Sequence, residues 1–265
     1  MMSKGLTLSG GFLVALVVLS LVITLAQRPA PVYAAGDSIP FRPGEKIHFI
    51  VKWAFIPAAE ATLQVLPMTR VNRTPSYHFA MIAKTYPYVD LLYRVRRRVD
   101  AFVDTGFNHS LLYRVKEEGQ KKRDITVNFD WKRRLAQYRN FDETRSPIPV
   151  LPGAFDPLSV FYAFRLFDLS EDLQISAIVS DGKKCVTGMA RVGNKETIKV
   201  RGKPFETFLV EPDLKDIGGV FRKSKDATLQ IWVTADKRHI PVRIKSKVVV
   251  GSFVAEMVSF DPGGR

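Results

Sequence analysis

The chain contains very little cysteine, with Cys185 the only one in 265 residues. No internal disulfide can therefore form, and the core must be stable without covalent cross-links. Lys183 and Lys184 precede this thiol and would lower its pKa if the side chain were exposed. A cysteine nucleophile also needs a base and an oxyanion site, and neither can be assigned. We therefore expect Cys185 to be dispensable.

Sequence patterns of common catalytic and metal sites are also missing. No metal-ligand spacing such as HxxxH connects the four histidines, so hydrogen-bonded structural roles are the simpler interpretation of His48, His78, His109 and His239. No serine stands in a G-x-S-x-G setting, and neither a P-loop nor a dinucleotide-binding fingerprint occurs. Chance accounts for the glycosylation sequons at Asn72 and Asn108. The sequence predicts no catalytic residue, no metal ligand and no cofactor.

Long apolar runs occur only near the start of the chain. Lys4 precedes an apolar run over residues 12–26, and Val32-Tyr33-Ala34 follows it, which is the pattern of a secretory signal peptide. We predict a signal peptide over residues 1–34, cleaved before Ala35, and a single β-rich periplasmic domain over residues 35–265. An uncleaved anchor in the inner membrane is the alternative, because residues 5–27 carry no charge and approach the roughly 20 residues that span a bilayer.

Acidic residues are outnumbered, since 26 Asp and Glu stand against 40 Lys and Arg and give a formal net charge of +14. The basic residues are clustered at "YRVRRRV", "GQKKRD", "WKRRL" and "FRKSK". For an exported protein, this excess favours anionic membrane lipid, lipopolysaccharide or acidic glycan as a partner, with peripheral membrane contact, over nucleic acid.

Two segments place basic residues on one face of a strand and apolar residues on the other. Period-two alternation puts Val95, Arg97 and Val99 on one face of the first segment, and Val242 and Ile244 on one face of the second. The opposite faces carry the basic residues of the two segments, namely Arg94, Arg96 and Arg98, and Arg243, Lys245 and Lys247. These two basic faces are either solvated outer faces or surfaces that dock anionic head groups.

From Gly44 onward, apolar and polar residues alternate with period two, and Gly, Asn, Asp or Pro separate the alternating segments. This pattern predicts roughly a dozen strands at the short spacing typical of a barrel or sandwich. The proline-rich stretch 146–157 is interpreted as a rigid crossover rather than a domain linker. Residues 216–226 hold a Gly-Gly pair followed by cations, which is typical of a solvated hairpin tip or of an anion-binding loop.

One segment departs from the strand pattern. Asp156 and Pro157 form an N-cap with proline at the first helical position, and apolar residues follow at near-3.6 spacing. We predict a helix over residues 156–167, buried as a plug inside a curved sheet because aromatic residues cover most of its circumference. The stretch "DLLYR" from Asp90 is interpreted as a loop that leads into a strand.

Several of these segments together resemble a bacterial exported family, the domain of unknown function DUF3108. They are "GEKIHFIVKWAFIPAAEATLQV", "ITVNFDWKRRLAQ", "FDPLSVFYAFRL", "GKPFETFLVEPDL" and residues 229–260. Family members carry glycine where this chain has Ala59, in a turn. The resemblance implies an exported β-rich domain and no particular activity. The last hairpin, with Trp232, Asp236 and Pro241, is also similar to periplasmic lipoprotein-carrier proteins, which are open curved sheets that hold acyl chains in a hollow plugged by a helix.

We expect a mainly β fold, made of a single strongly curved antiparallel sheet or incomplete β-barrel with one helix packed in its concave side. The cavity and core residues that we predict are Trp53, Phe161, Phe164 and Trp232, and the further core residues are Phe79, Phe129, Phe208 and Phe253. The favoured function is non-enzymatic binding of an amphipathic or anionic envelope component such as lipid, lipopolysaccharide or lipoprotein. An envelope-polymer hydrolase or transferase, and a scaffold that binds envelope proteins through exposed strand edges, remain alternatives.

Overall fold

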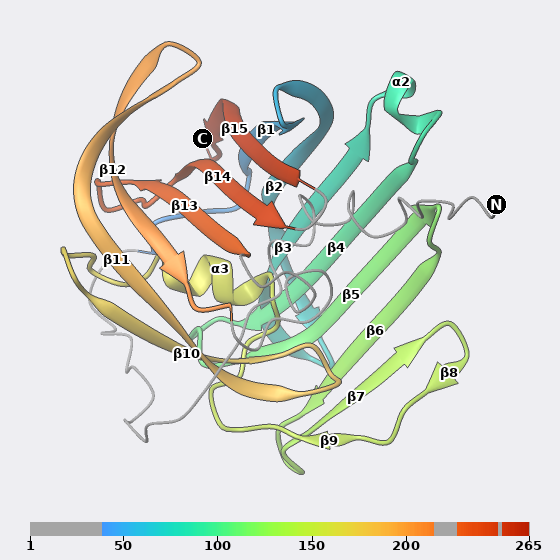
Figure 1. Cartoon of the computed structure of the whole chain (residues 1–265). Helices are drawn as coiled ribbons and strands as arrows, with labels where there is room; N and C mark the ends of the chain where they lie inside the picture. Colours follow the sequence, from blue (N-terminus) through green and yellow to red (C-terminus); the bar gives the residue numbers. More distant parts are fainter. Residues whose placement is uncertain (1–38, 215–226, 249–250, 265) are drawn as a thin grey trace.

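The computed structural model describes residues 39–214, 227–248 and 251–264 of the chain. Fifteen strands in these residues form one antiparallel sheet, and the order of its strands is open rather than circular. The sheet curls around the helix α3 (Ser159–Phe164), which lies in its hollow (Figure 1). The mainly β fold, with a single curved antiparallel sheet and a helix on its concave side, is thereby confirmed.

Consecutive strands lie side by side along most of the sheet. The first nine are β1 (Glu45–Trp53), β2 (Ile56–Val71), β3 (Thr74–Thr85), β4 (Val95–Asp104), β5 (Ser110–Gly119), β6 (Arg123–Asp130), β7 (Leu135–Asn140), β8 (Glu143–Thr144) and β9 (Ile148–Pro149). The other six are β10 (Gln174–Ser180), β11 (Cys185–Val200), β12 (Lys203–Pro212), β13 (Thr228–Thr234), β14 (Pro241–Val248) and β15 (Gly251–Pro262). The two halves join where β1 pairs with β15, with Glu45 opposite Pro262 and Trp53 opposite Phe253.

The predicted alternation determines which side chains face the hollow. In β1, the odd-numbered positions from Glu45 to Val51 are buried and the residues between them are partly exposed. In β4, Val95, Arg97 and Val99 are buried, while Arg98 on the other face is exposed. Because successive side chains of a strand point to opposite faces, this period of two is the expected result of one packed and one solvated face.

Two main apolar clusters fill the hollow on either side of α3. The first contains Phe79, whose ring stacks on Tyr162 of α3 with the ring centroids 3.9 Å apart. The second contains Phe208 and Phe253 and lies between α3 and the strands of the second half of the sheet. The predicted core residues Phe79, Phe129, Phe208 and Phe253 are all buried. Full burial of each such ring contributes on the order of 2 kcal/mol to the free energy of unfolding.

The two ends of the sheet approach each other inside the fold. Val179 of β10 forms a parallel bridge with Phe155, in the segment that precedes α3. The turn between β10 and β11 then packs against the opposite end of the sheet. At its Gly182, with φ +78°, a Cβ atom would lie 2.7 Å from the side chain of Val127 in β6 and 3.3 Å from that of Tyr138 in β7. We call this contact the seam.

The two short helices differ in detail from the sequence prediction. α3 covers residues 159–164 rather than 156–167, because Asp156 and Pro157 lie ahead of its first turn. A second helix, α2 (Pro87–Asp90), precedes the predicted loop, and Leu91 and Leu92 form a turn after it. The proline-rich crossover contains β9, which pairs with β7 in the same sheet.

Candidate binding site

Asp156 fixes the start of α3. Its Oδ1 accepts hydrogen bonds from the backbone N–H groups of Leu158 and Ser159, both at 2.9 Å, and Ser110 Oγ donates to its Oδ2 at 2.6 Å. The carboxylate thus satisfies N–H groups that have no partner inside the first turn of a helix. Burial raises the pKa of Asp156, although the hydrogen bonds from Ser110 and Ser159 act in the opposite direction.

A buried ion pair fixes the other end of α3. Arg165, the residue after the helix, donates to Glu45 Oε1 at 2.6 Å and to Glu45 Oε2 at 3.0 Å, and its Nε donates to the Arg238 carbonyl at 2.9 Å. The guanidinium carbon lies 5.1 Å from the ring centroid of Phe41 and 5.7 Å from that of Tyr162. Bidentate geometry compensates part of the free energy that removing both charges from water costs.

An apolar cavity of about 80 Å³ lies between α3 and the inner face of β10–β13. On the sheet side it is lined by the small residues Ala177, Gly188 and Ala190, which leave space that larger side chains would fill. Phe161 and Phe164 of α3 form the other side and are only half-buried. The arrangement can hold an apolar group between aromatic rings and a smooth strand surface.

The polar side chains beside this cavity carry little net charge into it. Arg165 is compensated by Glu45, as described above. His239 is the other titratable residue of the lining, and burial lowers its pKa, so its imidazole is neutral at neutral pH. Its Nδ1 lies 3.2 Å from the carbonyl oxygen of Thr234, which fits a ring N–H that donates to that carbonyl. The cavity therefore suits an apolar ligand group.

The four predicted cavity and core aromatics separate into two pairs. Phe161 and Phe164 line the cavity. Trp53 and Trp232 are half-buried and are not among the residues that line it in the described part of the chain. Trp53 stacks on Phe253 within the second apolar cluster, with the ring centroids 6.5 Å apart. Trp232 packs against a separate apolar cluster of Ile198, Val200 and Val242, away from the cavity.

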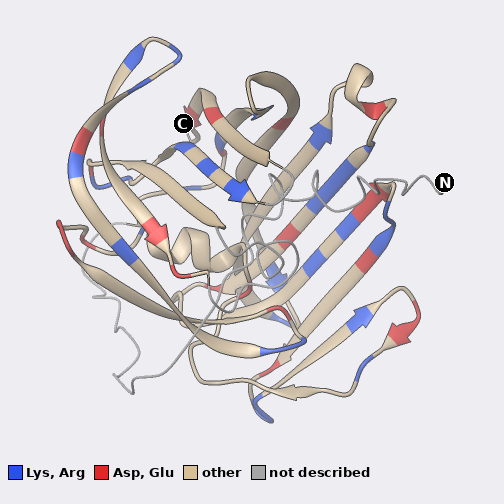
Figure 2. Cartoon of the chain, in the orientation of Figure 1, with Lys and Arg blue, Asp and Glu red and all other residues tan. Residues whose placement is uncertain are grey.

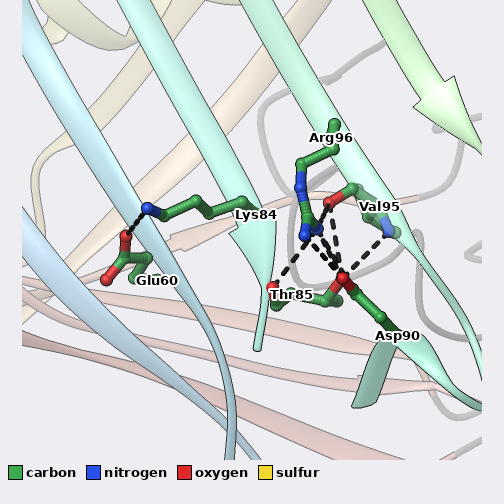
Figure 3. A network of polar contacts seen from close by, with 6 residues as sticks. All are labelled: Glu60, Lys84, Thr85, Asp90, Val95 and Arg96. Atoms are coloured by element: carbon green, nitrogen blue, oxygen red, sulfur yellow. Dashed lines mark hydrogen bonds and ion pairs between the residues drawn. The ribbon is translucent and has the colours of Figure 1, made fainter. Parts of the chain in front are cut away.

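The first basic face is largely paired with carboxylates, as the interspersed charges of Figure 2 indicate. Arg96 forms an ion pair with Asp90 at 2.5 Å and also donates to the Thr85 hydroxyl at 3.1 Å (Figure 3). The hydrogen bond that Arg96 donates to Asp90 is the largest cause of the lowered pKa of Asp90. Arg98 forms an ion pair with Asp100 at 2.7 Å. Arg94 is exposed and lies just before β4.

The second basic face is paired at one end and exposed at the other. Arg243 donates to Glu256 at 3.1 Å, and Lys52 forms an ion pair with the same carboxylate at 2.6 Å. Burial would raise the pKa of Glu256, but these two cations lower it. Lys245 and Lys247 are exposed. The two basic faces belong to different parts of the sheet, and the structure does not bring them together into one surface.

Sequence reasoning missed two interior ion pairs. Arg97 of β4 donates to Glu117 of β5 at 3.1 Å, and both side chains are less than 10% exposed. Arg165–Glu45 is the other pair. The alternation of the sequence places Arg97 on the inner face with Val95 and Val99, and so predicts a buried cation. It does not identify the acidic residue that pairs with it.

The remaining polar candidates occupy separate places. His48 contacts Thr62, His78 contacts Asp100, and the ring of His109 lies 4.1 Å from that of Trp131. Cys185 accepts a hydrogen bond from the Leu151 N–H, and burial raises its pKa. Across the described residues, no group of three or more His, Cys, Asp or Glu side chains is placed to hold a metal ion. The candidate loop 216–226 lies outside the described residues, and the sequon residues Asn72 and Asn108 both stand in turns.

This geometry defines a class of protein: a β-rich domain whose open, curved sheet holds a helix and an apolar cavity in its hollow. The chain matches the model of the family "Protein of unknown function (DUF3108)" over residues 48–258, and it belongs to this family. Among curated proteins, no match was found.

The fold is also found in a solved structure. It is the crystal structure of a beta-barrel-like protein of the domain of unknown function DUF1849 from Brucella abortus, with a TM-score of 0.52 and 9% sequence identity. The alignment covers 84% of this chain and 99% of that one. Within the described residues, neither helix has the length and apolar character needed to cross a membrane.

Proposed function

We propose that this protein is an exported, non-enzymatic cell-envelope protein that binds the apolar part of an amphipathic envelope component in the cavity beside α3. The main support for this proposal is the cavity itself, because small ligands usually bind in apolar pockets that contain few polar groups. Its volume of about 80 Å³ is well below the roughly 300–1,000 Å³ of pockets for drug-sized molecules. The ligand group that fits is therefore a short one, such as the end of an acyl chain.

The half-buried aromatic residues of α3 and of the segment just after it support this function. Phe161, Phe164 and Phe167 line the cavity from one side, and each ring is still partly exposed to water. Removing the rest of this apolar surface from water would be favourable. An apolar ligand that enters beside them removes the remaining apolar surface from water. Since α3 is held at both ends, by Asp156 and by Arg165, the ligand meets a preformed site.

The test fills the cavity without removing any existing contact. The variants Ala177→Leu and Ala190→Leu add three carbon atoms each at lining positions, and the control Gln174→Leu changes an exposed residue of β10 that does not line the cavity. Binding of octanoate, a probe with a short acyl chain, is titrated by calorimetry for each variant, and thermal unfolding verifies that each one folds.

We expect at least tenfold weaker probe binding for Ala177→Leu and Ala190→Leu, and binding near that of the parent for Gln174→Leu. Mass spectrometry of the parent, purified from the periplasm of an expressing bacterium, should also detect a co-purifying molecule with an acyl chain. A parent that binds no probe and carries no such molecule contradicts the proposal, as does equal binding by all folded variants.

A further inference from the structure

The exposed large apolar side chains gather at one end of the sheet. Antiparallel pairing brings the β1–β2, β3–β4 and β7–β8 connections to this same end. Of the nine large apolar side chains that are exposed in the described part of the chain, these connections carry six: Phe55, Ile56, Tyr88, Leu91, Leu92 and Phe141. Phe55 and Leu91 are 93% and 87% exposed. Isolated exposed apolar residues are ordinary, but a group of this size marks an interaction surface. We call it the apolar end.

The two main parts of the apolar end are tied to each other. The N–H of Tyr86 donates to the Ala58 carbonyl at 3.1 Å, and the Tyr88 hydroxyl donates to the Pro57 carbonyl. These bonds connect the segment around α2 to the start of β2. Figure 3 shows how Asp90, at the end of α2, is held by Arg96 of β4. The β1–β2 turn and the α2 turn therefore act as one structural unit.

The outward direction of Leu91 and Leu92 follows from the residues on either side of them. Val89 and Tyr93 are 8% and 6% exposed, so they anchor the turn in the fold from both sides. The N–H groups of Leu92 and Tyr93 both donate to the Val89 carbonyl, at 2.9 and 2.8 Å. This tight turn leaves the two leucine side chains no route into the core. Their exposure is a property of the folded turn.

Exposed cations lie at the apolar end, where the exposed carboxylates Glu118, Asp142 and Glu143 also occur. Arg94 follows the α2 turn, Lys121 and Lys122 occupy the adjacent β5–β6 turn, and all three are exposed. Arg201, at the tip of the β11–β12 hairpin, lies near enough to Tyr86 to act on its pKa. Exposed tyrosine and leucine beside lysine and arginine are the composition of segments that sit at the boundary between head groups and acyl chains. The cations complement anionic head groups.

We propose that the apolar end docks the protein on an anionic lipid bilayer, with Phe55, Leu91 and Leu92 inserted among the acyl chains. Arg94, Lys121 and Lys122 then lie at the level of the head groups. The apolar side chains project from the tips of narrow turns, a shape that penetrates a fluid surface more readily than it matches a second folded one. This surface is separate from the cavity beside α3, and the inference does not depend on the proposed function.

The first test removes the apolar side chains and uses vesicle co-sedimentation. The triple variant Phe55→Ser/Leu91→Ser/Leu92→Ser is compared with a matched control, Met68→Ser/Leu151→Ser/Val258→Ser, which removes the three exposed apolar residues that lie elsewhere. All proteins are produced from the full sequence. We expect the first triple to bind phosphatidylglycerol vesicles at least tenfold more weakly than the parent, and the control to bind like the parent. Parent-like binding by the first triple overturns the proposal.

The second test measures insertion directly. In a Phe55→Trp variant, the added indole should be quenched by brominated acyl chains in phosphatidylglycerol vesicles, beyond the quenching of the parent tryptophans. The same substitution at Met68 serves as the control and should show no added quenching. An indole at position 55 that is not quenched when the protein is vesicle-bound excludes insertion, even if the N-terminal segment contributes to the binding.

The third test concerns charge and a competing partner. Lys121→Gln/Lys122→Gln should weaken binding to phosphatidylglycerol vesicles several-fold, whereas Lys132→Gln/Arg133→Gln, in the turn at the opposite end of the sheet, should not. Sedimentation velocity examines self-association. If the parent is a dimer that the Phe55/Leu91/Leu92 triple variant dissociates, and the parent binds no vesicles, the apolar end is an interface between two copies and the membrane proposal is wrong.

Discussion

Asp100 shows how single residues balance the large basic excess of this chain. It lies on the outer face of β4, where Arg98 Nε donates to its Oδ2 at 2.7 Å and His78 Nε2 lies 2.8 Å from its Oδ1. Burial acts to raise the pKa of Asp100, but the hydrogen bonds from His78 and Arg98 outweigh it and lower the pKa to about 2. A carboxylate in this position stabilises the folded state as long as it is ionised.

Asp100→Asn should therefore reduce the free energy of unfolding at pH 7 by about 1–2 kcal/mol. The folded-state pKa of about 2 is below the ordinary value of 3.8. The stabilisation is thus fully present above about pH 4 and is lost as the pH falls toward 2. Urea unfolding at pH 7, 4 and 2.5 measures this trend. The exposed Asp142→Asn is the control, and a gap between parent and Asp100→Asn that does not depend on pH would contradict the prediction.

For single residues, the sequence predicted which face of a strand each side chain lies on, but not which residue it pairs with. Alternation correctly placed Arg97 with Val95 and Val99 and put Arg96 on the opposite side. The acid that meets Arg97 is Glu117, and this contact depends on the register between β4 and β5, which pairs these two residues directly. Registers are set by turns and by the packing of whole strands, so a local pattern cannot supply them. For the same reason, the two basic faces looked more cationic in the sequence than they are in the fold.

At the scale of elements, α3 depends on contacts that are distant in the sequence. Arg165 and Glu45 are separated by 120 residues and are 1% and 3% exposed. Asp156, which was predicted as an N-cap, does bind the first N–H groups of the helix, but α3 then extends for only six residues. Phe167 lies beyond the helix and still packs against the second apolar cluster. The apolar spacing near 3.6 therefore predicted correctly that this segment is buried, but it overestimated the length of the helix.

Glu45→Gln should lower the free energy of unfolding by about 3–5 kcal/mol, because it leaves the buried Arg165 charge without its partner. The double variant Glu45→Gln/Arg165→Met should be less destabilised than the single variant, since it removes both charges. Glu60→Gln breaks the exposed Lys84–Glu60 pair and serves as the control, with an expected loss below about 1 kcal/mol. Urea unfolding compares the four proteins. A Glu45→Gln protein as stable as the parent would show that the pair contributes nothing.

At the scale of the whole molecule, the seam keeps an open sheet compact. The β10–β11 turn closes the hollow by packing Gly182 against Val127 and Tyr138 instead of by a ladder of hydrogen bonds. The strands at the margins, β8 and β9, are two residues long, and Phe155 covers part of β10. Short or covered edges offer little backbone to an incoming strand, which weighs against a scaffold that binds partners through strand edges.

Gly182→Ala should destabilise the protein more than Gly202→Ala. Both glycines have positive φ values, +78° and +83°, so both substitutions strain the backbone. Only at Gly182 would the new methyl group also meet a neighbour, because nothing lies within 4 Å of a Cβ at Gly202. The extra loss at the seam should be about 1–3 kcal/mol, measured by thermal or urea unfolding. Equal losses for the two variants would mean that the seam is not tightly packed.

The pairing of β1 with β15 has a consequence for how the protein is made. β1 leaves the ribosome well before β15, yet one of its two edges is completed only by β15, in a register that joins Glu45 to Pro262. At roughly 5–20 residues per second, this edge stays unpaired for roughly 10–40 seconds of synthesis. During that time the nascent chain cannot close the middle of its sheet, and an unpaired strand invites aggregation. Until β15 has emerged, the free edge of β1 is therefore exposed to pairing with other unpaired strands.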